Sequence, residues 1–327
     1  MGVKNLMQLL NKNAKNSIVK KEWSSYNGYK IAIDANLYIY KFLYNNGNCV
    51  KNFFEQILYL WKNNVTPVYV FDGKPPIEKK ETLIKRKEIL FNMEKRINEL
   101  ENKRNYSTET VEIDDEIKKL QKRLIKPEIE DIDNVKRLMY LLGIDIYNSP
   151  CEGDFLIADL YKKGLVDACL TDDTDSLPNG CGVVLRNFTF RTNEITEIKL
   201  DDLLQELEFT HDQFVDLCIL CGTDYMESVK GIGSMTAYKL IKENINIENV
   251  IYNNKNPIKL ENIENYEKVR ELFKVFDYNY EITKGALDYD LNIIKKFLET
   301  NCNYRDKTLE KKIKNISDTL NTSLKNI

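Results

Sequence analysis

Three short apolar segments of this 327-residue chain each run directly into acidic side chains, and this pattern constrains the fold most strongly. Residues 30–33 lead into Asp34, residues 67–71 into Asp72, and residues 168–170 into Asp172, Asp173 and Asp175. Longer segments with helical periodicity alternate with them, which predicts an α/β fold with a mostly parallel central sheet flanked by helices. Because ligands bind beyond the carboxyl ends of such strands, the acidic ends should meet in one crevice.

Between residues 74 and 127 the chain becomes dense in charge and keeps a helical periodicity. Fifteen basic and eleven acidic residues give this segment a net charge of +4, although the whole chain carries −3. A solvated helical hairpin is the plainer interpretation of such a run. The sharper alternative is an arm that binds phosphate groups beside the acidic crevice.

A glycine-rich turn at residues 231–234 opens into a helical pattern at residues 235–240. Backbone N–H groups at a turn of this kind, and at the helix N-terminus that follows, can bind an anion. A helix-turn-helix that serves only packing explains the motif equally well.

Seven cysteines and a single histidine limit the chemistry that is available. The odd, scattered cysteines do not form a secreted disulfide framework, so reduced thiols and an intracellular location are expected. Cys218 and Cys221 form a CxxC inside an apolar run without a second such pair, which favours core packing over zinc binding. No apolar run of about 18 residues is present, so no membrane association is expected. Catalysis would therefore depend mainly on carboxylates.

Seven carboxylates form a candidate metal site, namely Asp34, Asp72, Glu152, Asp154, Asp173, Asp175 and Asp224. Buried carboxylates repel one another, so such a cluster persists only when cations neutralise it. Oxygen ligands favour Mg²⁺, with Mn²⁺ as a substitute. Two such ions about 4 Å apart suit phosphodiester hydrolysis. Single aspartates are more often helix caps or surface residues, but capping alone does not explain three acidic strand ends together with two paired-acid motifs.

At these residues the chain resembles the flap endonucleases of the xeroderma pigmentosum group G nuclease superfamily. The resemblance covers nearly the whole chain and rests on IAIDANLYIYKFL, VYVFDGKPP, SPCEGDF, TDDTD and LCILCGTDYMESVKGIG. It implies a PIN-like 5′ nuclease core with an inserted helical arch and a helix–two-turn–helix. It also implies metal-dependent cleavage of branched DNA near junctions of single and double strands, with release of a 5′ flap.

The resemblance implies that residues 1–327 form one structure-specific nuclease domain. Its regions are an N-terminal nuclease part (1–76), the arch (77–130), an internal nuclease part (131–212), the duplex-binding helix–two-turn–helix (213–289) and C-terminal helices (290–327). The expected chain is a monomer that acts on DNA in replication, repair or recombination. Its expected location is nuclear in a eukaryotic host, and otherwise the cytoplasm or a viral replication site.

The resemblance also assigns roles to individual residues. All seven carboxylates match metal ligands, and Asp34, Asp72 and Asp175 are counted as catalytic. Lys79 and Arg86 match two basic residues that reach the scissile phosphate, and their spacing of seven predicts a common helix face.

Further matched positions concern DNA binding. Tyr40 matches an aromatic residue that stacks on a substrate base, and Gly2 matches a residue beside the active site. Gly231, Gly233 and Ser234 match the turn that grips duplex DNA, where the resemblance implies a K⁺ ion.

Some positions depart from the family pattern. Asp154 stands where flap endonucleases usually have Glu, Gly153 replaces the usual Ala, and the loop between Asp34 and Asp72 is short. A 5′-exonuclease or gap nuclease of the same superfamily is therefore one alternative function, and a non-catalytic junction-binding module is another. No glutamine-led motif with paired aromatics follows the last helical segment, so clamp binding through that motif is not predicted.

Overall fold

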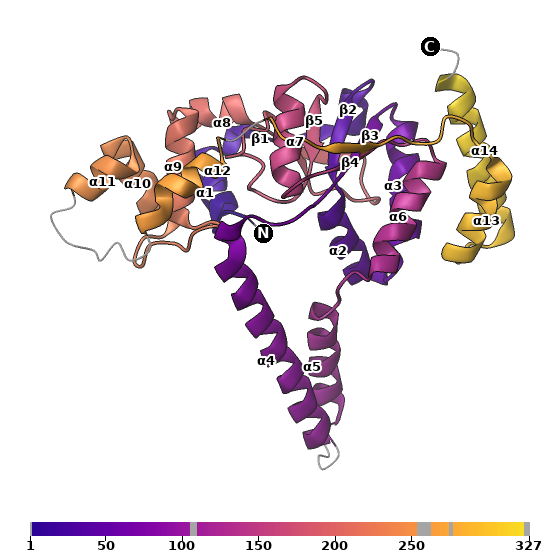
Figure 1. Ribbon diagram of the computed structural model, residues 1–327, viewed down its shortest axis with the longest axis horizontal. Helices are drawn as coiled ribbons and strands as arrows, with labels where there is room; N and C mark the ends of the chain where they lie inside the picture. Colours follow the sequence, from indigo (N-terminus) through magenta and orange to yellow (C-terminus); the bar gives the residue numbers. More distant parts are fainter. Residues whose placement is uncertain (1, 105–109, 254–262, 275–276, 324–327) are drawn as a thin grey trace.

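The fold is built on one eight-stranded sheet with the order β1-β7-β6-β5-β2-β3-β4-β8 (Figure 1). The structure is a computed structural model that describes residues 2–104, 110–253, 263–274 and 277–323. The strands are β1 Ile18–Glu22, β2 Lys30–Asp34, β3 Thr66–Phe71, β4 Ile146–Asn148, β5 Ala168–Leu170, β6 Val183–Arg186, β7 Glu194–Lys199 and β8 Glu281–Thr283. The pairs from β6 through β5, β2 and β3 to β4 are parallel, and the outer pairs are antiparallel. The predicted mostly parallel sheet is confirmed.

The central strands are apolar because both faces of the sheet are covered. Ala32 of β2 packs into the hydrophobic core on one face, whereas Ile31 and Ile33 pack into the core on the other. Side chains alternate between faces along a strand, so a strand buried on both faces reads as a continuous apolar run. The same alternation places Val70 and Phe71 of β3 in different cores.

Helices form a layer on each face of the sheet. One core contains side chains of α1 Leu6–Asn13, α7 Gly153–Lys162, α8 Leu200–Leu207, α9 His211–Cys221, α10 Ser234–Asn244, α11 Ile247–Asn253 and α12 Tyr266–Leu272. The other contains side chains of α2 Ala35–Asn46, α3 Cys49–Lys62, α6 Ile129–Leu141, α13 Leu291–Asn301 and α14 Asp306–Ser323. Among the described residues, no helix is both long enough and apolar enough to cross a membrane.

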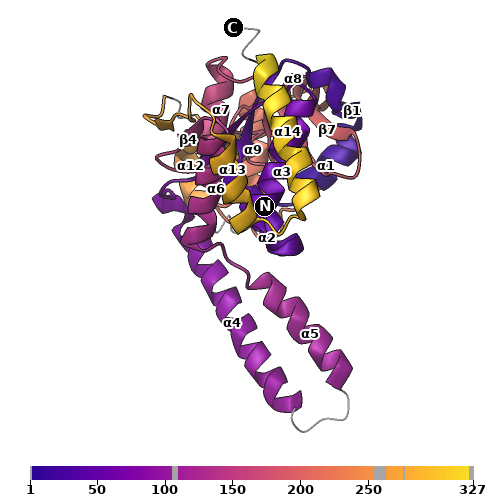
Figure 2. The ribbon, with the colours of Figure 1, turned by 90° about the vertical axis from the view of Figure 1, so that its right-hand side faces the viewer.

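The charged insertion forms a helical hairpin that projects from the body of the molecule (Figures 1 and 2). It consists of α4 Lys80–Arg104 and α5 Thr110–Arg123. Its own small core is made of Ile97, Leu100, Ile113 and Ile117. Ion pairs such as Arg96 Nε to Glu116 Oε1 at 3.1 Å link the two helices. The predicted helical arch is confirmed, and its base rises beside the carboxyl ends of the central strands.

The helix–two-turn–helix is formed by α9 and α10 with their connection. Thr210 and Gln213 form a capping box that begins α9. Gly222 ends the helix at a φ of 94°, where a Cβ would lie 2.6 Å from the backbone nitrogen of Ser228. Cys218 and Cys221 are buried, as core packing predicts, and the structure has all seven cysteines as free thiols.

Candidate active site

The carboxylate Asp34 links the end of β2 to the start of α2. It is the last residue of the strand, and its side chain accepts a hydrogen bond from Leu37 N at 2.9 Å. Aspartate is a preferred N-cap because it satisfies a free N–H group of the first turn. Its second oxygen accepts from Thr171 Oγ1 at 3.1 Å, which ties Asp34 to the neighbouring strand β5.

Asp72 follows β3 and contacts the start of α7. Gly153 N donates to Asp72 Oδ1 at 2.6 Å, and a Cβ on Gly153 would lie 2.8 Å from the same oxygen. The close approach therefore favours glycine at this position, which gives a physical reason for the replaced alanine. Glu152 immediately precedes α7, and Asp154 lies in its first turn.

Asp173 and Asp175 lie in a tight, buried turn after β5. Asp175 N donates to Asp173 Oδ1 at 3.2 Å, and Ser176 Oγ donates to the carbonyl of Asp173 at 3.0 Å. Their exposed fractions are 8% and 2%. The turn thus holds two carboxylates close together with little access to water.

These elements bring the predicted acids to one hollow. A cavity of about 710 Å³ is lined by Asp34, Asp72, Glu152, Asp154, Asp173 and Asp224. Asp175 lies behind the lining, and its pKa is raised well above the usual range by burial and then by neighbouring Asp173 and Asp224. The strand-end geometry expected from the sequence is therefore present for Asp34, Asp72, Asp173 and Asp175, and the start of α7 and the connection after α9 bring the other three acids to the same place. The roles of all seven as ligands remain predictions.

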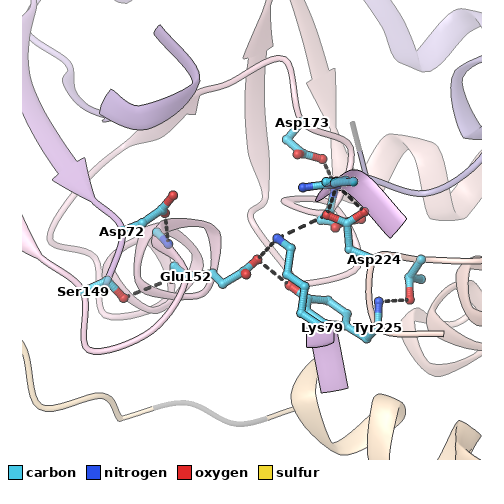
Figure 3. Close-up of polar contacts among 11 residues, drawn as sticks. Asp72, Lys79, Ser149, Glu152, Asp173, Asp224 and Tyr225 are labelled. Atoms are coloured by element: carbon cyan, nitrogen blue, oxygen red, sulfur yellow. Dashed lines mark hydrogen bonds and ion pairs between the residues drawn. The ribbon is translucent and has the colours of Figure 1, made fainter. Parts of the chain in front are cut away.

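Two cations from the arch neutralise part of this cluster. Lys79 Nζ lies 2.6 Å from Glu152 Oε2 and 3.2 Å from Asp224 Oδ2 (Figure 3). Arg86 Nη2 donates to both oxygens of Asp224 at 2.8 and 2.7 Å. Tyr225, which the sequence did not single out, donates its hydroxyl to Glu152 Oε2 at 3.0 Å. Its only sequence signal is its position directly after Asp224.

The expectation that Lys79 and Arg86 share a helix face is wrong in one respect. Lys79 ends the short 3-10 helix Ile77–Lys79, and α4 begins one residue later. Pro75 and Pro76 precede this turn. The two cations nevertheless reach the same carboxylate because the turn and the first helical turns run along the cavity.

Burial makes the charged form of these acids costly. Burial, followed by the charge of Asp72, raises the pKa of Asp34 to about 8. Burial also raises the pKa of Asp72 and puts the pKa of Asp154 well above its usual range, with Asp173 adding to the latter. For Lys79, burial lowers the pKa, but Glu152 and Asp224 outweigh it and the pKa is raised. The acids need more positive charge than the arch supplies.

The residues fit a divalent cation chemically. Asp154 Oδ1 and Asp175 Oδ1 are buried oxygens without a hydrogen-bond partner in the part of the chain that the structure describes, and the groups around them that could bind a metal are carboxylates. Such oxygens suit Mg²⁺ or Mn²⁺. Among the described residues, no group of three or more acidic, histidine or cysteine side chains is arranged to hold a metal as it stands. Lys79 and Arg86 form ion pairs with Glu152 and Asp224 in this arrangement. The two basic side chains would have to turn away before these carboxylates could bind a metal.

Without divalent metal, the stability of the protein should fall as the pH rises. A carboxyl whose pKa is higher in the folded than in the unfolded chain lowers the stability of the protein as the pH rises above the unfolded pKa. For Asp34 this pH range runs from about 4 to about 8. We expect the free energy of unfolding in EDTA to decrease across that window, and Mg²⁺ to remove most of the decrease. Urea unfolding at several pH values checks this. A stability in EDTA that rises between pH 5 and 8 would contradict it.

Gly2 lies against the carboxylate turn. A Cβ at this position would lie 2.1 Å from Asp173 Oδ1 and 2.9 Å from Asp175 Oδ1, and its φ of 83° disfavours any other residue. The site prediction for Gly2 therefore has a steric basis that the sequence alone did not reveal.

Replacing Gly2 by alanine should displace the acidic turn and lower the rate of the DNA cleavage that the resemblance implies roughly 10²-fold, because displacements of about 1 Å can cost that much. Gly28→Ala is a matched control, since Gly28 has the same φ of 83° but nothing within 4 Å of a Cβ. Rates under single-turnover conditions check the pair. Equal rates for both variants would show that contact with the acids is unimportant.

The remaining predicted residues occupy two places. Tyr40 lines the mouth of the carboxylate cavity and is 48% exposed. Gly231, Gly233 and Ser234 form the turn into α10, and the cavity lining, as far as the structure describes it, does not include them. They belong to a separate surface next to the connection that carries Asp224.

Comparison with known proteins shows the family to which the chain belongs. The models of the XPG N-terminal domain and the XPG I-region match residues 1–93 and 143–224. Flap endonuclease 1-A of Sorghum bicolor is 37% identical over 295 residues, which cover 84% of this chain and 75% of that protein. The chain belongs to the flap endonuclease family of XPG nucleases. The two matched regions carry the seven carboxylates with Lys79 and Arg86, and the arch beyond residue 93 lies between them.

Solved structures agree with this membership. Flap endonuclease-1 from Methanococcus jannaschii is 26% identical, with a TM-score of 0.68 and coverage of 94% of this chain and 98% of that one. The catalytic core of Rad2 with DNA substrate has a TM-score of 0.70 at 22% identity, covering 96% and 100%. The Holliday junction-resolving enzyme GEN1 with product DNA and Mg²⁺ has a TM-score of 0.50 at 18% identity, and the match covers 93% of this chain and 66% of that one. These last two likenesses concern the fold alone.

Proposed function

We propose that this flap endonuclease family member is a structure-specific DNA nuclease that cleaves 5′ flaps near junctions of single and double strands. The observation that carries the proposal is the meeting of six carboxylates with Lys79 and Arg86 at one cavity, with the buried Asp175 next to them. An acidic pocket repels a phosphodiester, so a substrate can enter only when cations and basic side chains offset that charge.

The carboxylates are the groups that would hold two divalent ions, Mg²⁺ or Mn²⁺. When bound, such ions supply activation of water and stabilisation of the leaving oxygen. Asp154 and Asp175 present the free oxygens for this purpose, and Asp34 and Asp72 fix the strand-end side of the cavity.

Lys79 and Arg86 would bind the phosphate that is cleaved. Both already contact carboxylates that line the cavity, so a short rotation would carry them to a phosphate placed among those acids. Their charges would stabilise the negative charge that develops on the phosphate oxygens, which is a large source of rate enhancement in enzymes. Tyr40 at the cavity mouth would stack on the adjacent base.

The turn into α10 would hold the duplex next to the junction. No described residue lies within 4 Å of a Cβ at Gly231 or Gly233, which supports a backbone open to a partner, and Ser234 begins the helix. Helix N-termini bind phosphates through free N–H groups. The proposal includes a K⁺ ion at this turn, duplex contacts without sequence reading, and binding that weakens steeply with salt.

The proposal also includes a monomeric enzyme that acts inside the cell. The seven free thiols support a reducing compartment. Whether that compartment is a nucleus, a cytoplasm or a viral replication site depends on the host.

The direct test is incision of a labelled 5′-flap duplex with Mg²⁺, with Mn²⁺ and with EDTA. We expect cleavage near the junction with either metal, products with 5′-phosphate and 3′-hydroxyl ends, and none in EDTA. Tight flap binding without product at any metal would instead support a non-catalytic junction-binding module. Single nucleotides released from blunt or gapped duplexes, with little flap cleavage, would support the exonuclease or gap nuclease.

A further inference from the structure

Tyr225 contacts the candidate metal ligand Glu152 but received no role from the sequence. Its hydroxyl donates to Glu152 Oε2 at 3.0 Å, and Lys79 Nζ lies 2.6 Å from the same oxygen (Figure 3). Neither of these contacts uses the second oxygen, Oε1. The hydroxyl therefore fixes one oxygen of Glu152 and leaves the other outside the contact.

The Tyr225 side chain is itself fixed by its packing. It is 6% exposed, and its ring stacks on Phe155 at 5.7 Å between centroids with 24° between the planes. Phe273 packs against it in a T-shaped arrangement at 5.9 Å and 74°. The backbone N–H of Tyr225 donates to Thr223 Oγ1 at 3.2 Å. A ring enclosed in this way has little freedom to turn, so its hydroxyl has a defined position.

The other donor to Glu152 does not stay in place. Lys79 has to turn away before Glu152 binds a metal, and the proposed function then takes its charge to the phosphate. Of the two donors, Glu152 keeps only the Tyr225 hydroxyl. Water has little access to replace this hydroxyl, because the Glu152 side chain is 12% exposed. Partners that orient a metal-binding carboxylate typically contribute about 10- to 100-fold in metal affinity or activity.

We infer that Tyr225 is a positioning residue whose hydroxyl orients Glu152 toward a divalent ion once Lys79 has turned away. The inference rests on the metal site of the proposed function. A tyrosine that only fills the core could be replaced by phenylalanine without effect, because the contacts with Phe155 and Phe273 involve the ring alone. The hydroxyl is therefore the group to test.

The first test measures binding of Mn²⁺ alone to the full chain by electron paramagnetic resonance. Tyr225→Phe removes the hydroxyl, keeps the ring, and should weaken at least one Mn²⁺ site about tenfold. Tyr278→Phe is the matched control, because Tyr278 also stacks on Phe155, at 6.2 Å. It removes a hydroxyl from the same aromatic stack and leaves the contact between Tyr225 and Glu152 intact. This control should bind Mn²⁺ as the wild type does.

A second comparison tests whether Tyr225 acts through Lys79 instead. Lys79 Nζ lies 5.9 Å from the centre of the Tyr225 ring, so the ring could influence the site by holding this cation. In the Lys79→Ala background, Tyr225→Phe should still weaken Mn²⁺ binding about tenfold, since the hydroxyl acts on Glu152 directly. Disappearance of the effect in that background would overturn the inference.

Incision of the 5′-flap duplex gives a readout that core packing alone would not move. Tyr225→Phe should need about ten times more Mg²⁺ to reach half of its maximal single-turnover rate, and at saturating Mg²⁺ it should approach the wild-type rate. Flap binding in EDTA should be unchanged, because the described lining of the carboxylate cavity does not include Tyr225. An equally low rate at every Mg²⁺ concentration, or the same defect in Tyr278→Phe, would overturn the positioning role.

The outcomes separate the inference from the proposed function. Wild-type protein that binds Mn²⁺ but does not incise the flap ends the proposed function, and the Mn²⁺ comparison then still decides whether the hydroxyl orients Glu152. Wild-type protein that incises the flap, together with a Tyr225→Phe variant that binds Mn²⁺ equally well, leaves the proposed function standing and overturns the positioning role. Wild-type protein that binds no Mn²⁺ overturns it as well.

Discussion

Replacing Asp175 with alanine should lower flap incision at least roughly 10³-fold, the scale seen when a member of a catalytic unit is removed. Binding of the flap in EDTA should stay within a few-fold of the wild type, because Asp175 lies behind the cavity lining and is 2% exposed. Its free oxygen is one of the two that would hold metal. Single-turnover rates and anisotropy on the same substrate separate the two effects.

The same variant should be more stable than the wild type when metal is absent. Asp175 is buried among Asp173 and Asp224, so removing its charge relieves repulsion. Asp167→Asn is the control, because Asp167 stands at the opposite end of β5 and accepts from Lys30 N at 2.7 Å, far from the acidic strand ends. Incision by Asp167→Asn at the wild-type rate is expected. Loss of flap binding in Asp175→Ala would mean that this residue maintains structure instead.

Replacing Lys79 with alanine should slow the chemical step by about 10²- to 10³-fold, comparable to removing one donor to a developing charge. Affinity should change much less, since duplex contacts lie elsewhere. Lys80→Ala provides the control, because Lys80 is adjacent in sequence, exposed and at the first position of α4. Rates measured at saturating enzyme distinguish chemistry from binding.

Stability in EDTA should move in opposite directions for the two variants. Lys79 is only 13% exposed and is the cation that Glu152 and Asp224 share, so its loss leaves two poorly solvated carboxylates facing each other. Lys79→Ala should therefore be less stable than the wild type without metal, and Mg²⁺ should restore most of the loss. A variant that is equally slow but unchanged in metal-free stability would place Lys79 outside the acid cluster.

The convergence of the carboxylates could be predicted from the sequence because strand ends in a parallel sheet share one edge. Asp34, Asp72 and Asp173 each follow an apolar strand, and the register of β2 with β3 and β5 brings those ends together. The arch could also be predicted from the sequence, because its charge density and helical periodicity extend over a long segment.

Other features depend on three-dimensional contacts that no local pattern contains. Tyr225 reaches Glu152 because the connection after α9 packs against α7, where the Tyr225 ring stacks on Phe155 at 5.7 Å between centroids. The 3-10 turn that ends at Lys79 was not visible in the spacing of the charges, and the steric role of Gly2 arises from a turn about 170 residues away.

The most direct test of the central claim is the number of Mn²⁺ ions that each chain binds, measured by the loss of free Mn²⁺ signal in electron paramagnetic resonance. The account predicts two saturable sites in the wild type, loss of at least one in Asp175→Ala, and wild-type binding in Asp167→Asn. Saturable Mn²⁺ binding that is unchanged in Asp175→Ala, or its absence from an active wild type, would contradict the account.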